Sequence, residues 1–353
     1  MRRSPGCFKQ LSIALFLVAA RGSSAGAASA APPDVAGYLR DVAGFAPDRL
    51  AALEAGEAIV KTASDKEGEL SVVGAVRVRT TKEHVKLYFD EYIKFEDGVV
   101  VLRVGRFASP PTLQDVARLQ LEPGDIEALR SCRPGDCEVQ IGAGLAELQA
   151  AIDWRAPDHA ERVNAFVRQR LVDYVKAYRE RGDAALVTYA DGKEPLSLAR
   201  AWQSLLAKAP HLHEYAPELR RYLEEYPRAS LPGGSDFIQW SKVDQGLKPV
   251  IALAHVTLYR DAAKPDRISV ASKQIYASRF SEGAFSLATV VDAAPQGGQA
   301  LSYVVLVSRT RTDVLRGKLG GMKRKLSGGE IQKGVALTLR QMQEGLEKAA
   351  GVR

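Results

Sequence analysis

The sequence predicts an α+β protein built on an antiparallel sheet, with a helical insertion and a long C-terminal helix. Strand-like alternation of apolar and polar residues occurs at 71–80 and 99–107, and it returns in five consecutive segments between 236 and 309. Helical spacing dominates the intervening stretch 143–226 and the tail from 310 to 349. Strands interrupted by a block of helices are typical of the α+β class.

The first thirty residues read as a secretory signal peptide. Arg2, Arg3 and Lys9 precede the apolar run Leu11–Ala20, and Ala28-Ser29-Ala30 forms a cleavage pattern. An uncleaved membrane anchor is the alternative, but this run is much shorter than the roughly 20 residues that span a bilayer. We therefore expect cleavage near Ala30 and export to the periplasm or the exterior.

The charge of the chain gives no reason to expect a nucleic-acid partner. It has 49 Lys+Arg and 42 Asp+Glu over 353 residues, a formal charge of +7. Arg2, Arg3, Lys9 and Arg21 lie in the signal segment, which contains no acid, so the rest of the chain is nearly neutral. Nucleic-acid binding needs a concentrated Lys/Arg footprint. Nothing in the sequence identifies a protein partner.

The N-terminal third combines a linker with the first strands. Residues 31–70 read as an Ala/Pro-rich linker and a mixed segment, and 71–80 is the first clear strand. Thr80 to Glu83 is a capping box that predicts a helix ending near Gly98, before the strand at 99–107. Short helices fit 112–122 and 124–131, and 137–141 reads as another strand.

Two cysteines remain once Cys7 leaves with the signal peptide. Cys132 and Cys137 flank a Pro-Gly turn, so their thiols can approach and form a disulfide in an oxidising compartment. A zinc or redox site is the rival, but zinc needs about four ligands. The other metal candidate, His211-Leu212-His213-Glu214, has no evident third ligand. We expect a disulfide, no metal and no cofactor.

The division of the chain follows from these segments. The first part of the sheet domain spans 71–142, the helical insertion 143–230, and the second part of the sheet domain 231–353. Within the insertion, residues 163–178 have the spacing of a long helix, further helices fit 196–208 and 216–225, and 184–189 fits either a strand or a helix. The candidate strands of the second part are 236–243, 250–260, 268–278, 284–292 and 301–309. Their short connections predict an antiparallel meander.

The C-terminal tail carries two apolar stripes. Their members are Leu315, Leu319, Met322 and Leu326, and then Ile331, Val335, Leu339, Met342 and Leu346. The stripes are offset at Ser327-Gly328-Gly329-Glu330, which is itself a capping-box pattern. The tail is therefore either two helices or one helix with a break.

This order of elements is similar to the helix-grip fold of the START/Bet v 1-like superfamily. The resemblance covers residues 71–141 and 236–349, and the segments Ile275-Tyr276-Ala277-Ser278 to Tyr303 and Arg309 to Gly320 look like uncharacterised secreted bacterial proteins of this type. It implies a curved sheet around the last helix, with an apolar cavity between them. Members typically bind or carry hydrophobic ligands, and a minority are enzymes. The helical insertion departs from the plain pattern.

Candidate ligand-binding residues come from the strands of the second part. His255 lies among apolar residues and could be a polar handle in a cavity or a proton-transfer group, although a hydrogen-bonded core histidine is the more ordinary interpretation. Aromatic residues with polar ends suit an apolar pocket. The ligand-binding candidates are Trp240, His255, Tyr259, Tyr276, Phe285 and Tyr303. Packing in a solid core explains the aromatic residues equally well.

A basic cluster follows the last strand. Its members are Arg309, Arg311, Arg316, Lys318, Lys323, Arg324 and Lys325. Such a patch could contact anionic lipid headgroups at a membrane surface. A solvated helix face is the simpler explanation.

These observations favour a non-catalytic exported protein that holds a lipid or another hydrophobic molecule between its sheet and its C-terminal helix. Two alternatives stay open. One is an enzyme on the same fold that uses His255 with a nearby Tyr or Asp for acid–base chemistry. The other is an envelope protein whose helical insertion docks a partner and whose sheet is solidly packed.

Overall fold

The computed structural model describes most of the chain that follows the predicted signal segment. The described residues are 32–85, 101–133, 135–140, 144–190, 192, 194–209, 212, 216–244, 248–312, 315 and 320–352. The predicted signal peptide and most of the predicted helix after Thr80 lie outside these residues, although residues 82–85 are helical.

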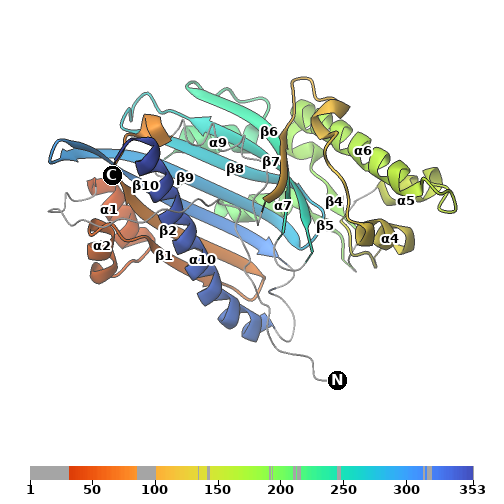
Figure 1. Cartoon of the computed structure of the whole chain (residues 1–353), viewed down its shortest axis with the longest axis horizontal. Coiled ribbons are helices and arrows are strands. Elements are labelled where there is room, and N and C mark those ends of the chain that lie inside the picture. The colour runs from red at the N-terminus through yellow and green to blue at the C-terminus, as the bar shows by residue number, and fades with distance from the viewer. Residues whose placement is uncertain are drawn as a thin grey trace.

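One antiparallel sheet of eight strands organises the molecule, in the order β1-β2-β10-β9-β8-β7-β6-β3 (Figure 1). The strands are β1 (Ile59–Ser64), β2 (Glu69–Val78), β3 (Val101–Arg106), β6 (Gly234–Val243), β7 (Val250–Tyr259), β8 (Arg267–Ala277), β9 (Ser281–Gln296) and β10 (Gln299–Thr312). Strands β6 to β10 are neighbours in chain order, so the predicted meander is confirmed. A separate small hairpin pairs β4 (Thr188–Tyr189) with β5 (Leu196–Ser197).

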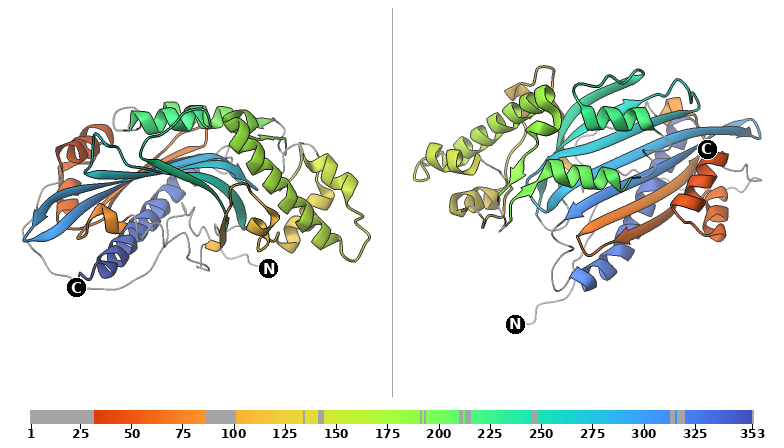
Figure 2. Two further views of the ribbon diagram at one scale, coloured as in Figure 1. Left: turned by 90° about the horizontal axis from the view of Figure 1, so that it is seen from above. Right: turned by 180° about the vertical axis from the view of Figure 1, so that it is seen from behind.

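Helices cover both faces of the sheet (Figure 2). The helices before the insertion are α1 (Pro33–Gly37), η1 (Tyr38–Val42), α2 (Pro47–Glu54), η2 (Leu113–Val116) and α4 (Pro123–Ser131). The later helices are α5 (Gly144–Ala151), α6 (His159–Arg181), η3 (Gly182–Ala185), α7 (Leu198–Ala207), α9 (Pro217–Glu225) and α10 (Gly320–Ala349). In the left view of Figure 2, α10 lies on one side of the sheet and the helices of the insertion lie on the other.

Strand β10 shows how the two faces are separated. Val304 and Leu306 pack with the apolar residues of α10, whereas Tyr303, Val305 and Val307 pack with α1, η1 and α2 on the other side. Because successive side chains of a strand point to opposite faces, the strand pairing carries this division across the whole sheet. We call the two sides the α10 face and the insertion face.

The C-terminal tail forms one continuous helix from Gly320 to Ala349, so both expected arrangements, two helices and one helix with a break at residues 327–330, are wrong. The helix packs against β1 and β2, where Gly74 provides the room. A Cβ atom added to Gly74 would lie only 2.7 Å from Leu339 Cδ1. Gln332 of α10 also donates a hydrogen bond to the backbone oxygen of Val60 on the edge strand β1, at 2.8 Å.

The helices of the insertion form a layer on the sheet. Helix α7 lies directly on β9, because a Cβ atom added to Gly283 would meet Leu205 Cδ1 at 3.4 Å and Ala201 Cβ at 3.5 Å. At the end of α7, Lys208 bonds Glu69 of β2 at 2.8 Å, so the insertion is tied to the N-terminal hairpin as well.

Three segments differ from the expectations. Residues 31–70, expected as a linker and a mixed segment, contain α1, η1, α2 and the edge strand β1. Only 113–116 of the segment 112–122 is helical. The predicted strand at 137–141 does not form in the described part, residues 137–140. Gln140 N donates a single backbone hydrogen bond to the Ser278 carbonyl, and no row of strand-pairing hydrogen bonds follows it.

Candidate functional site

All six predicted ligand-binding residues lie on the insertion face. Trp240, His255 and Tyr276 pack with α4 to α6, Tyr259 and Phe285 pack with α7 and α9, and Tyr303 packs with α2, where its hydroxyl donates to Glu54 Oε2 at 2.6 Å. Apart from the half-buried Tyr276, they are at most 5% exposed. None of them faces α10, so the expected placement between the sheet and the C-terminal helix is wrong for these residues.

His255 lies at the centre of a buried polar network between the insertion and the sheet. Its Nε2 lies 2.7 Å from Asp236 Oδ2 on the neighbouring strand, and its Nδ1 lies 3.0 Å from the Tyr178 hydroxyl on α6. A carboxylate only accepts hydrogen bonds, so in the neutral ring Nε2 carries the proton and Tyr178 donates to Nδ1. The Tyr222 hydroxyl of α9 donates to the same oxygen of Asp236, and the Tyr226 ring lies 4.4 Å from that of His255.

Lys273 extends this network along the sheet. It is the direct cross-strand neighbour of His255 and has no exposed surface. Its ammonium group pairs with Asp183 of η3, donates to the Leu223 carbonyl of α9 at 3.2 Å, and lies 4.4 Å from the centre of the Trp202 ring on α7. Lys273 of the sheet thus contacts three helical elements of the insertion: η3, α9 and α7.

Burial shifts the titration of these groups. Desolvation lowers the pKa of His255 below its ordinary value of 6.5, against the opposing hydrogen bond with Asp236. Desolvation likewise lowers the pKa of Lys273, although Asp183 opposes the shift. For Asp236 the hydrogen bonds outweigh burial. Burial would raise its pKa, but the hydrogen bonds from His255 and Tyr222 hold the pKa below its ordinary value.

The chain of contacts from Tyr178 through His255 and Asp236 to Tyr222 can relay a proton in principle. Both nitrogens of His255 are already bonded within the protein, and the ring has no exposed surface. The network reaches solvent at Asp236, whose side chain is 32% exposed. The sequence indicates only an unspecified Tyr or Asp as a partner of His255. Strand alternation could not identify Tyr178 or Tyr222, because they come from distant helices.

The α10 face differs from the insertion face on the same strands. Helix α10 packs against the β1 and β2 end of the sheet, and towards β6 the α10 face keeps a surface of half-buried, small and apolar side chains. We call this surface the open strip. It is made up of Phe237, Ala254, Leu258, Val270, Ser272 and Ser286. On β7 the contrast is direct, because Leu253 and His255 are fully buried while Ala254 between them is not.

Two members of the predicted basic patch, Arg309 and Arg311, lie among the described residues, and both are already paired with acids. Arg309 lies on the insertion face opposite Phe285 and pairs with Glu69, and Arg311 pairs with Glu282. Arg316 and Lys318 lie outside the described residues, as do the side chains of Lys323, Arg324 and Lys325.

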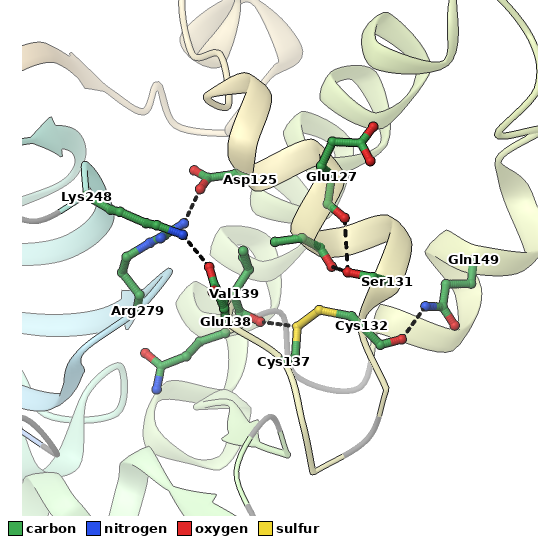
Figure 3. The surroundings of a disulfide bond; sticks show 12 residues. Asp125, Glu127, Ser131, Cys132, Cys137, Glu138, Val139, Gln149, Lys248 and Arg279 are labelled. Atoms are coloured by element: carbon green, nitrogen blue, oxygen red, sulfur yellow. Dashed lines mark hydrogen bonds and ion pairs between the residues drawn. A yellow bond between two sulfur atoms is a disulfide. The ribbon is translucent and has the colours of Figure 1, made fainter. Parts of the chain in front are cut away.

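Cys132 and Cys137 form a disulfide, as predicted, with their Cα atoms 4.7 Å apart (Figure 3). The Gln149 amide donates to the Cys132 carbonyl at 2.7 Å and fixes the bridge to α5. Next to the bridge, Lys248 pairs with Glu138, and Arg279 pairs with Asp125. The disulfide therefore joins the end of α4 to residues 137–140, where the Gln140 carbonyl accepts a hydrogen bond from Tyr276 of β8.

Among the described residues, no group of three or more His, Cys, Asp or Glu side chains is arranged to hold a metal ion. His211, His213 and Glu214 lie outside that part of the chain. In the described part, no helix combines the length and the apolar character that crossing a membrane requires.

The fold and the two faces define an α+β protein with an eight-stranded antiparallel sheet, a helical layer on one face and a C-terminal helix on the other. No family model matches the chain, and no curated protein matches it. Solved structures with a distant likeness include TTHA0849 from Thermus thermophilus, with 16% identity, TM-score 0.23, and coverage of 41% of this chain and 91% of that one.

Two rhizobial structures show a similar degree of likeness. The Mll3558 protein from Rhizobium loti has 15% identity and TM-score 0.16 over 38% of this chain and 88% of its own. An uncharacterised protein from Rhizobium leguminosarum has 14% identity and TM-score 0.20 over 40% of this chain and 87% of its own. Likeness at this level carries no argument about function.

Proposed function

We propose that the protein binds a hydrophobic small molecule or a lipid on the open strip, beside α10. One observation carries the proposal, namely the contrast between the two faces of the same strands. The insertion seals its face with a polar network and a packed core, whereas Ala254, Leu258 and Val270 of the α10 face stay half-buried. Partly exposed apolar surface on a soluble domain is typical of an interaction site.

The helix-grip resemblance supports this proposal, because the ligand would lie on the same face of the sheet as the last helix, beside it. The six residues first expected to bind the ligand then have a structural role, because they anchor the insertion layer. Export to an oxidising compartment is part of the same proposal, and the Cys132–Cys137 bridge supports it.

Binding of the uncharged fluorescent probe Nile red tests the proposal. Ala254→Phe places a large ring on the strip and should weaken probe binding at least tenfold while the protein stays folded. Ala294→Phe makes the same chemical change at an exposed position outside the strip and should leave binding unchanged. Native mass spectrometry of the exported protein should show a hydrophobic adduct, and a bare mass together with no probe uptake would reject the proposal.

An acid–base enzyme is the second candidate, favoured by the contact of His255 with Asp236 and by the partial exposure of Asp236. His255→Ala separates the two candidates. If the function is ligand binding, the variant keeps its bound molecule whenever it folds. If the function is catalysis, the variant binds the molecule but no longer converts it.

A further inference from the structure

Arg106, at the rim of the open strip, has no ionic partner among the described residues. Arg106 ends the edge strand β3 and is opposite Gln239 of β6, which places it on the α10 face. Its side chain is exposed, and its guanidinium carbon lies 4.0 Å from the centre of the Phe237 ring. No acidic side chain in the described part of the chain pairs with it. The other edge cation of β3, Arg103, is opposite Lys242 and so lies on the insertion face.

The charges near the strip make Arg106 distinctive. Two acids of β9, Asp292 and Glu282, already have cationic partners in Lys82 and Arg311. The six residues of the open strip are uncharged. An anion that approaches the strip therefore meets the Arg106 cation at one end and the neutral side chains of the six strip residues along the rest.

We propose that the open strip binds a free long-chain carboxylate whose headgroup is held by Arg106. This inference rests on the proposed function and names the class of ligand. A guanidinium group matches the two oxygens of a carboxylate, and the Phe237 ring holds the guanidinium plane in position before the ligand arrives. A single cation suits a monoanion better than a phosphate dianion.

The geometry of the strip fits the chain of such a ligand. The path from Phe237 on β6 to Ser286 on β9 passes over Val256 of β7 and Ser272 of β8. Val256 is itself buried, at 7% exposed, and so lies beneath this path. Three strand spacings correspond to roughly 14 Å of floor, which suits most of a long acyl chain. Ala254, Ser272 and Ser286 have small side chains, so a ligand chain can lie close to the sheet there. Leu258 and Val270 provide apolar contacts at the side of the strip.

Competition against Nile red with palmitate and with methyl palmitate tests the headgroup contact. The two ligands share a chain and differ in charge. Arg106→Gln should weaken palmitate about fivefold, Arg106→Lys by about twofold, and neither should change the ester, because an exposed ion pair contributes modestly to binding. Arg103→Gln is the matched control on the same strand and should change neither ligand. High salt should remove the preference for palmitate, since screening weakens exposed charge pairs.

The outcomes separate this inference from the proposed function. If the acid and the ester bind equally well and Arg106→Gln has no effect, the headgroup contact is refuted and hydrophobic binding stands. If neither ligand nor Nile red binds, the proposed function fails as well. If the protein instead sediments with phosphatidylglycerol vesicles and does not bind palmitate, a lipid surface replaces the free carboxylate and the inference is overturned.

Discussion

Replacing Asp183 with alanine should destabilise the protein far more than replacing its partner Lys273 with methionine. The ammonium group of Lys273 has no exposed surface, whereas the Asp183 side chain is 20% exposed. Loss of Asp183 leaves a charge sealed between β8, α9 and the Trp202 ring, with the Leu223 carbonyl as its remaining hydrogen-bond partner. Removing one member of a buried pair costs about 3–5 kcal/mol, whereas replacing buried charges with apolar side chains is often nearly neutral.

Urea unfolding at pH 7.5 measures this asymmetry. Asp183→Ala should lower the free energy of unfolding by about 3–5 kcal/mol, and Lys273→Met by only about 1 kcal/mol because Asp183 can still be hydrated. The double variant should recover most of the loss. The native pKa of Lys273 lies below 10.5, so between the native and unfolded pKa values the unfolded state binds more protons and stability rises with pH. Asp183 opposes the lowering of this pKa, so the pH range of the effect should be wider in Asp183→Ala. A loss below about 1 kcal/mol in Asp183→Ala, or a double variant no more stable than it, would refute the buried charge pair.

Three further predictions concern separate parts of the fold. The pKa of His255 is below 6.5 in the folded state, so as pH falls the unfolded state binds a proton at this residue before the folded state does. The free energy of unfolding should therefore fall as pH drops through 6.5, and His255→Gln should reduce this pH dependence. Gly74→Val should cost about 1–3 kcal/mol in urea unfolding, because the added atoms overlap Leu339, and an unchanged midpoint would contradict that packing. Replacing both Cys132 and Cys137 by serine should cost about 2 kcal/mol, from the entropy of the short loop, and a wild-type midpoint unaffected by reductant would show that the bridge does not form.

The sequence was informative where local alternation and tertiary structure agree. The meander from 234 to 312 and the C-terminal helix follow from apolar periodicity, and both are present. At residues 327–330 a capping pattern and two glycines favour a helix end locally, so the sequence predicts a break there. In the folded protein the helix continues through this segment, and the apolar residues that follow it, from Ile331 to Leu346, pack on the sheet.

The position of the candidate site could not be predicted, for a physical reason. Alternation correctly grouped His255 with Tyr259 on one side of β7, but it does not say which layer covers that side. The resemblance suggested the C-terminal helix, whereas the insertion occupies the face instead. No sequence pattern marks the open strip, because Ala254 and Ser272 are small residues common in any strand. The position of the edge cation Arg106 beside Phe237 depends on strand pairing, which the sequence does not show.

The bond from Gln332 to Val60 has a consequence for how the chain is made. An open strand edge is a template for intermolecular pairing and aggregation. The edge strand β1 is synthesised early, whereas α10, which packs on β1 and bonds its backbone, follows every strand in the chain. During synthesis the edge of β1 therefore stays uncovered until α10 has been made, so products truncated before α10 should depend on chaperones far more than the full-length protein does.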